Sequence, residues 1–104
     1  MKMIVQTPDF KPNQKLLDFV TREVEKLDHL SDRIVEIRVC LKIEKTDSRD
    51  NKICELIGVM PGSELFAMRK SSAFEQATVN AVNALKRQVT DWKEKKKLKR
   101  QSLP

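Results

Sequence analysis

Residues 33–45, RIVEIRVCLKIEK, alternate between apolar and polar side chains over almost their whole length. Successive side chains of an extended chain point to opposite faces, so this alternation predicts a long, half-buried β-strand. One face of the strand would carry the apolar side chains Val35, Ile37, Val39, Leu41 and Ile43. An apolar sheet face must be covered by another layer, so the chain has to fold in at least two layers.

Three further stretches have the composition of strands. Residues 3–6 are mostly apolar, and two prolines follow them. Residues 52–60 and 64–70 flank the pair Pro61-Gly62, which is typical of a turn between antiparallel strands. Both faces of this hairpin carry apolar residues. We expect four of these apolar residues on the sheet face away from the helices, namely Ile57, Val59, Phe66 and Met68. A shift of one residue in the strand would reverse the two faces.

Two segments show the 3.6-residue apolar period of an amphipathic helix. In residues 13–30 the apolar stripe consists of Leu16, Phe19, Val20, Val24 and Leu27. Pro12 suits the first turn of this helix, and Ser72 and Glu75 have the spacing of a capping box at the start of the second. The second stripe consists of Phe74, Ala77, Ala81, Leu85, Val89 and Trp92. Lysines follow on the same face, so we expect the last turns to project into solvent or onto a partner.

The predicted order of elements is β-α-β-β-β-α. Short connections favour an antiparallel four-stranded sheet with both helices on one face, a two-layer α+β fold. The 104 residues are enough for one domain with a single modest core. We expect residues 1–93 to form this domain and residues 94–104 to form a basic helix end and tail.

The sequence offers little to an enzyme or a metal site. His29, the only histidine, is expected near the end of the first helix, where its charge would offset the helix dipole. No nucleophile motif accompanies it, and one histidine with two separated cysteines provides too few ligands for a metal. Cys40 and Cys54 are expected to be buried, reduced thiols that could face each other on adjacent strands. We therefore expect no catalysis, cofactor, metal or small-molecule substrate.

The compartment follows from two absences in the sequence. No apolar run approaches the roughly 18–20 residues that span a bilayer. The first ten residues also lack the apolar segment and cleavage site of a signal peptide. We expect a cytoplasmic protein with no membrane partner.

Positive charge is concentrated at the end of the chain. Residues 1–85 contain 13 Lys/Arg and 13 Asp/Glu, whereas residues 86–100 contain eight and two, which accounts for the net charge of +6. On a helix these cations would form one patch beside the apolar stripe, made of Lys86, Arg87, Lys93, Lys95, Lys96, Lys97 and Arg100. This asymmetry is typical of a polyanion binder. Because aromatic residues are scarce, phosphate contacts to folded RNA are favoured over base stacking or membrane binding.

Three segments together resemble a known family. They are KLLDFVTREVEKLDHLSDRIVEIRVCLKIEK, then MPGSELFA, then ALKRQV followed by lysines. Across residues 3–97 the chain is similar to the short ribosome hibernation promoting factors, which belong with the bacterial ribosome-associated inhibitors and sigma-factor modulation proteins. The resemblance implies a β-α-β-β-β-α fold similar to a double-stranded-RNA-binding domain. It also implies binding to the small ribosomal subunit in the channel for mRNA and tRNA, which silences idle ribosomes under stress and in stationary phase.

Carried over position by position, the resemblance implies rRNA contacts at Lys26, Lys70, Arg87 and 93–97. The chain departs from the family pattern at Ala84, where the family has lysine, at Lys86, where it has glutamate, and at Ala73, where it has an acidic residue. Together with the charge pattern, the predicted RNA-binding residues are Lys26, Lys70, Lys86, Arg87, Lys93, Lys95, Lys96, Lys97, Lys99 and Arg100.

The leading hypothesis is a non-enzymatic translation inhibitor that occupies the mRNA–tRNA channel of the small subunit through rRNA phosphate contacts. One alternative is a protein-interaction module that uses the exposed sheet face, which would also allow weak self-association. Another is a generic double-stranded-RNA binder. Such domains usually begin with a helix, whereas this chain begins with the strand-like residues 3–5.

Overall fold

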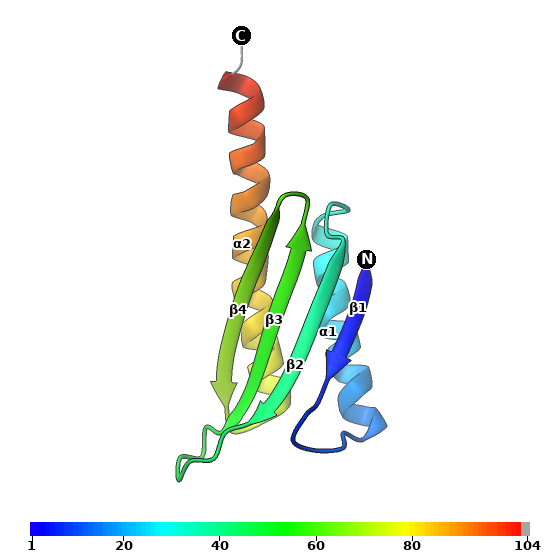
Figure 1. Ribbon diagram of the computed structural model, residues 1–104, viewed down its shortest axis with the longest axis vertical. Coiled ribbons are helices and arrows are strands. Elements are labelled where there is room, and N and C mark those ends of the chain that lie inside the picture. Colours follow the sequence, from blue (N-terminus) through cyan, green and yellow to red (C-terminus); the bar gives the residue numbers. More distant parts are fainter. Residues whose placement is uncertain (103–104) are drawn as a thin grey trace.

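The computed structural model describes the backbone of residues 1–102 and the side chains of residues 1–96. Along the chain the elements are β1 (Lys2–Gln6), α1 (Gln14–Leu30), β2 (Glu36–Ile43), β3 (Lys52–Met60), β4 (Ser63–Ser71) and α2 (Phe74–Ser102). Both helices cover the same face of a four-stranded sheet (Figure 1). The predicted two-layer α+β fold is therefore confirmed.

The sheet is mixed, with its strands in the order β1-β2-β3-β4. β2, β3 and β4 are antiparallel neighbours, but β1 pairs with β2 in parallel. The expectation of an all-antiparallel sheet is therefore wrong for β1. The reason is α1, which carries the chain back to the end of the sheet where β1 began, and a crossover of this kind joins parallel strands.

The alternation that predicts β2 holds inside the strand and fails just before it. Ile37, Val39 and Leu41 are buried, as predicted. Val35 precedes the strand and is 58% exposed, while its neighbour Ile34 is buried. Residues 31–35 form the connection from α1, where the backbone need not keep the two-residue period of a strand. Ile34 therefore takes the core position predicted for Val35.

Pro61 and Gly62 form the two-residue connection between β3 and β4, since Met60 pairs with Ser63 across it. Gly62 has a φ of 74°, in the left-handed region that side chains disfavour. The pairing places Ile57 opposite Phe66, and Phe66 is 51% exposed. Along both strands these positions alternate with buried ones: Ile57 and Val59 are half-buried, and Met68 is exposed. The residues predicted for the outer sheet face are therefore confirmed, namely Ile57, Val59, Phe66 and Met68.

α1 begins at an asparagine cap. The backbone amide of Leu16 donates to Asn13 Oδ1 at 2.8 Å, so Pro12 precedes the cap and does not lie in the first turn as predicted. His29 is exposed in the last turn, which agrees with its predicted place. The predicted stripe is confirmed for the fully buried Val20, Val24 and Leu27 and for the half-buried Leu16, which packs against the core. Phe19 is half-buried and is not one of the side chains that pack against the core.

α2 begins one residue later than a capping box would require. The amide of Ala77 donates to the Ala73 carbonyl at 3.1 Å, which makes Ala73 the cap residue. The predicted box of Ser72 and Glu75 is therefore wrong, although Glu75 still places a negative charge in the first turn, where the helix dipole favours it. The predicted apolar stripe is confirmed, because all of its members are buried, namely Phe74, Ala77, Ala81, Leu85, Val89 and Trp92.

The two cysteines lie on opposite faces of the sheet. Across β2 and β3, Cys40 pairs with Glu55 and Leu41 pairs with Cys54. The idea that the thiols face each other is wrong, because a shift of one residue in register reverses the face. Both thiols are free; Cys54 is fully buried and Cys40 is half-buried on the outer face.

α2 is longer than the sheet it covers. Its 29 residues span about 43 Å at the usual rise of a helix, whereas the nine residues of β3 span about 30 Å. Figure 1 shows α2 continuing beyond the β3–β4 turn, as predicted for its last turns. The helix passes without a break through the predicted division between residues 93 and 94. Within residues 1–102, no helix has both the length and the apolar character needed to cross a membrane.

Candidate nucleic-acid interface

The predicted RNA-binding residues are spread over three elements, and most of them lie on α2. Lys95 and Lys96 are exposed on the part of α2 that follows Trp92, the last buried side chain in the described part of the chain. Lys96 Nζ lies 5.5 Å from the centre of the Trp92 ring, within the range of a cation–π contact. Three other predicted residues lie outside the described side chains, namely Lys97, Lys99 and Arg100.

Lys26 and Lys70 each have a carboxylate partner. Lys26 Nζ lies 2.9 Å from Glu23 Oε1 on α1, and Lys70 Nζ lies 3.0 Å from the Glu44 carboxylate. Lys70 also faces away from the helices, because it follows Met68 by two residues on β4. The structure therefore does not bring Lys70 together with the cations of α2. Both ion pairs are exposed and weak enough for a phosphate to compete with them.

Lys93 has a structural contact that the sequence did not predict. Its Nζ donates a hydrogen bond of 2.9 Å to the carbonyl of Leu30, the last residue of α1. The carbonyls at a helix end carry partial negative charge, so the ammonium group both satisfies and stabilises them. Lys93 thus ties α2 to the end of α1.

Trp92 lies under two cations, Lys96 and Arg33, at the same end of the helix layer. Its side chain is 9% exposed, and Arg33 lies 6.0 Å from the ring centre. The indole Nε1 is buried without a hydrogen-bond partner among the described residues. Trp92 therefore closes the core below the basic end of α2, as the sequence predicted.

Arg87 belongs to a polar pocket at the boundary between β4 and α2. This β4–α2 pocket has a volume of about 260 Å³ and is lined by Arg69, Asn80, Asn83, Ala84 and Arg87. Sequence reasoning identified Arg87 and missed Arg69. Arg69 follows Leu65 and Ala67 on the inward side of β4, and a cation at an inward position of a strand is a detectable sign of a sheet edge. The neighbouring Lys86 is half-buried.

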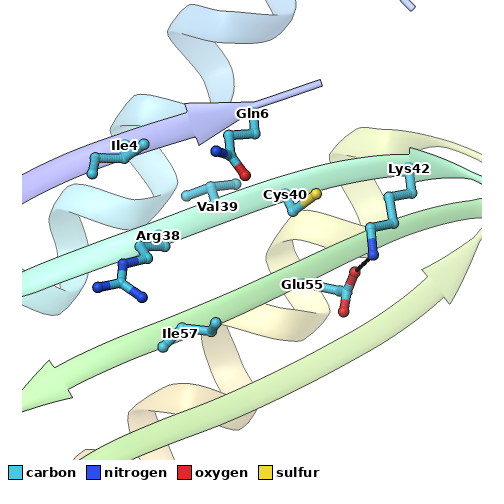
Figure 2. A pocket seen from close by; sticks show the side chains of 8 residues that line it. All are labelled: Ile4, Gln6, Arg38, Val39, Cys40, Lys42, Glu55 and Ile57. Carbon is cyan, nitrogen blue, oxygen red and sulfur yellow. Dashed lines mark ion pairs between the residues drawn. The ribbon is translucent and has the colours of Figure 1, made fainter. Parts of the chain in front are cut away.

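The outer sheet face holds a larger hollow whose charges are paired (Figure 2). It has a volume of about 510 Å³ and is lined by Ile4, Gln6, Arg38, Val39, Cys40, Lys42, Glu55 and Ile57. Lys42 Nζ lies 2.5 Å from Glu55 Oε1, and this hydrogen bond raises the pKa of Lys42. Arg38 Nε lies 2.6 Å from Glu36 Oε2. Burial raises the pKa of the Cys40 thiol in the same hollow.

Comparison with known families identifies the chain. A family model described as "Sigma 54 modulation protein / S30EA ribosomal protein" matches residues 3–97, nearly the whole length. The chain belongs to this family. The S30EA match ends inside α2, among the lysines that follow Trp92. A search of curated proteins finds no match.

Two solved structures share the fold of this S30EA family member. A ribosomal subunit interface protein from Coxiella burnetii has a TM-score of 0.79 and 17% identity, with 90% of this chain and 99% of that chain covered. The N-terminal domain of Protein Y from Thermus thermophilus has a TM-score of 0.75 and 18% identity, with 88% and 99% covered. At these identities the likeness establishes the fold. The family description names a modulation protein and a ribosomal protein, and no class of enzyme.

Proposed function

We propose that this protein is a ribosome hibernation factor, a translation inhibitor that occupies the mRNA–tRNA channel of the small ribosomal subunit. The observation that carries the proposal is the membership of residues 3–97 in the S30EA ribosomal protein family. With a ribosomal partner, we expect the protein to act in the cytoplasm. Inhibition by occupancy requires no catalysis, and we expect it to operate in bacteria under stress and in stationary phase.

The distribution of charge suggests which side meets rRNA. Four cations of the outer sheet face have carboxylates within 4.0 Å, and these are Lys2, Arg38, Lys42 and Lys70. The α2 side carries exposed cations with no carboxylate within 4.0 Å among the described side chains, including Arg87, Lys95 and Lys96. Unpaired cations attract phosphate without first losing a protein partner. We therefore propose that the helix side, and chiefly α2, faces the RNA.

Inhibition follows from a bound domain whose shape excludes mRNA and tRNA. The sheet and the two helices share one core, so the domain enters a channel as a rigid body. The phosphate contacts hold it there and carry no sequence information, because phosphates are the same at every nucleotide. The protein would thus recognise the shape of folded rRNA.

Co-sedimentation with separated ribosomal subunits tests the partner. Purified protein is mixed with small or large subunits at low and at high salt, and the bound fraction is measured after pelleting. We expect binding to the small subunit alone, with an affinity that falls as salt rises, because cation–phosphate contacts release counterions. Failure to pellet with either subunit at low salt would contradict the proposal.

A competition experiment tests occupancy of the channel. Small subunits are first loaded with a short mRNA and a deacylated tRNA, and the protein is then added in increasing amounts. We expect the protein to displace both ligands, and bound tRNA to reduce the protein's apparent affinity in return. Simultaneous full binding of all three would place the protein elsewhere on the subunit.

The outer sheet face supports a second function, weak self-association. It exposes Phe66 and Met68, 51% and 37% exposed, beside paired charges that let two copies meet without repulsion. Sedimentation velocity over a concentration series should detect association that Phe66→Ser removes. Val35→Ser is the control, because Val35 is also an exposed apolar residue, 58% exposed, but precedes β2. A wild-type protein that stays monomeric at the highest concentration would contradict this function.

A further inference from the structure

We propose that the β4–α2 pocket, lined by Arg69, Asn80, Asn83, Ala84 and Arg87, is a binding site for one phosphate group. The phosphate belongs either to an RNA backbone, in which case the site rests on the proposed function, or to a free nucleotide. Both sources present the same oxyanion chemistry, and the experiments below separate them.

The pocket is assembled from two elements by their regular spacing. Asn80, Asn83 and Arg87 are three and four residues apart, so their side chains form one row along α2. Arg69 comes from the facing edge strand β4. Ala84 has only a methyl side chain, which leaves room between the row and the strand. Two guanidinium groups therefore flank a space large enough for a small oxyanion.

The charges of the lining all favour an anion. Among the described side chains, the lining contains two arginines and no carboxylate. Neither Arg69 nor Arg87 has a carboxylate within 4.0 Å among the described side chains, whereas Lys26 and Lys70 do. A guanidinium group presents several N–H donors in a plane that matches two phosphate oxygens. Two guanidinium groups without carboxylate partners are therefore suited to donate hydrogen bonds to the oxygens of one phosphate.

Local hydrogen bonds hold the donors in place. Arg69 Nη1 donates to the Met68 carbonyl at 2.7 Å, which orients the guanidinium and leaves its other N–H groups available. Gln76 Nε2 donates to Asn80 Oδ1 at 2.9 Å, so the NH2 group of Asn80 remains as a donor. Gln88, which directly follows Arg87, bonds both backbone groups of Phe66 and fixes α2 against β4. A site whose donors are already held loses less entropy on binding.

The pocket suits a phosphate better than a base. No aromatic side chain of residues 1–96 lines it, so a nucleobase would find no surface to stack on there. The pocket would bind the phosphate and leave the rest of the nucleotide in solvent. This favours a backbone phosphate of RNA as the natural occupant.

Titration of the isolated protein with inorganic phosphate tests the site without ribosomes. Side-chain Nε–H signals of arginine and NH2 signals of asparagine are followed by NMR at constant ionic strength, with chloride replaced by phosphate. We expect saturable shifts at Arg69, Arg87, Asn80 and Asn83 and none at Arg22, an exposed arginine of α1. Equal shifts at every arginine, or no saturation, would overturn the proposal.

Two variants and a matched control sharpen this result. Asn83→Asp places a carboxylate in the pocket, and Arg69→Gln removes a guanidinium; both residues are exposed, so the fold is retained. Each change should weaken phosphate binding about tenfold, as expected for loss of a charge-assisted contact. Arg22→Gln removes the same charge from α1 and should leave the binding unchanged. Unaltered phosphate binding in both pocket variants would overturn the site.

The source of the phosphate is then distinguished with two further probes. Adenosine 5′-monophosphate is titrated in place of inorganic phosphate, and Asn83→Asp is tested for binding to small ribosomal subunits. A backbone site predicts that the monophosphate binds like inorganic phosphate and that the variant loses affinity for the subunit. If the wild type binds no ribosomal subunit but still saturates with phosphate, the proposed function fails and the phosphate site stands.

Discussion

The cationic side chains of this protein differ in what surrounds them, and these surroundings decide how each would meet a phosphate. Lys42 is 2.5 Å from a carboxylate, and Lys93 donates to the end of α1. Lys95 has no carboxylate within 4.0 Å among the described side chains. A phosphate would have to displace a partner from the first two residues and nothing from the third. Equal formal charges therefore imply unequal contributions to RNA binding.

Lys93 and Lys95 provide a direct comparison of two exposed lysines two residues apart. Lys93→Gln should lower the free energy of unfolding by about 0.5–1 kcal/mol, because the Leu30 carbonyl loses a charged donor at a helix end. Lys95→Gln should leave stability within experimental error. Urea denaturation of both variants gives the measurement. Equal stability of the two variants would mean that the Lys93 contact contributes nothing.

The two thiols should differ in reactivity and in its dependence on pH. Burial raises the pKa of Cys54 to about 11 and also raises the pKa of the half-buried Cys40. A thiol reagent should therefore label Cys40 slowly at pH 8, faster as pH rises, and Cys54 only after unfolding. Rapid labelling of two thiols in the native protein would contradict this.

The raised pKa of Cys54 also implies that its contribution to the free energy of unfolding is full below about pH 8.5 and falls as pH rises towards 11.

Sequence reasoning found the cations of α2 but not their partners. A helical projection correctly places Arg87, Lys95 and Lys96 on the exposed side of α2. The two-residue period of β4 would have placed Lys70 on the outer face with Met68, and Arg69 on the opposite face. It could not show that Arg69 and Arg87 line one pocket, because that depends on β4 lying beside α2, and strand order is a long-range property of the fold.

At the scale of elements, one side chain pairs with the exposed edge of β4 at Phe66. The amide of Phe66 donates to Gln88 Oε1 at 3.2 Å, and Gln88 Nε2 donates to the Phe66 carbonyl at 2.5 Å. The glutamine thus bonds the backbone as a neighbouring strand would. Unpaired edge groups are the usual point at which sheets from two molecules join, so this contact also opposes edge-to-edge aggregation.

Removing this contact should both destabilise the fold and open the edge. Gln88→Ala should cost about 1–2 kcal/mol of unfolding free energy, because two hydrogen bonds to the strand backbone are lost. It should also speed hydrogen exchange of the Phe66 amide. Gln76→Ala is the control, since Gln76 lies on the same helix but bonds only the side chain of Asn80. Unchanged exchange at Phe66 would show that the edge is protected by other means.

The elements themselves were predictable where apolar periodicity is long. The alternation within β2 and the two helical stripes are set by burial against one core, and each is visible in a single stretch of sequence. The direction of β1 and the cap of α2 were predicted wrongly. A strand of five residues carries no sign of its orientation, and a cap depends on a shift of one residue in backbone geometry.

At the scale of the whole molecule, the two faces have different charge and different proposed partners. The outer sheet face combines the exposed apolar residues Phe66 and Met68 with paired charges. Figure 2 shows one of these pairs, Lys42 with Glu55. The helix side and the extended end of α2 carry most of the excess positive charge. Association through one face therefore leaves the other available, which makes RNA binding and self-association compatible.

This division can be tested by changing the net charge by the same amount at two different places. Lys95→Glu/Lys96→Glu and Lys45→Glu/Arg49→Glu each lower the net charge from +6 to +2, the first pair on α2 and the second in the β2–β3 connection. Only the double substitution on α2 should strongly weaken binding to the small ribosomal subunit. It should also reduce the slope of log affinity against log salt by about 1.4–1.8, the value for two lost phosphate contacts.

The measurement is co-sedimentation with small subunits at several salt concentrations, with melting curves of both variants to establish that each is folded. Melting matters because Lys96 also lies over the Trp92 ring. If positioned contacts hold the protein to rRNA, the two variants differ in affinity despite their equal charge. Equal losses in both would mean that attraction depends on net charge alone, and that α2 has no special place in the complex.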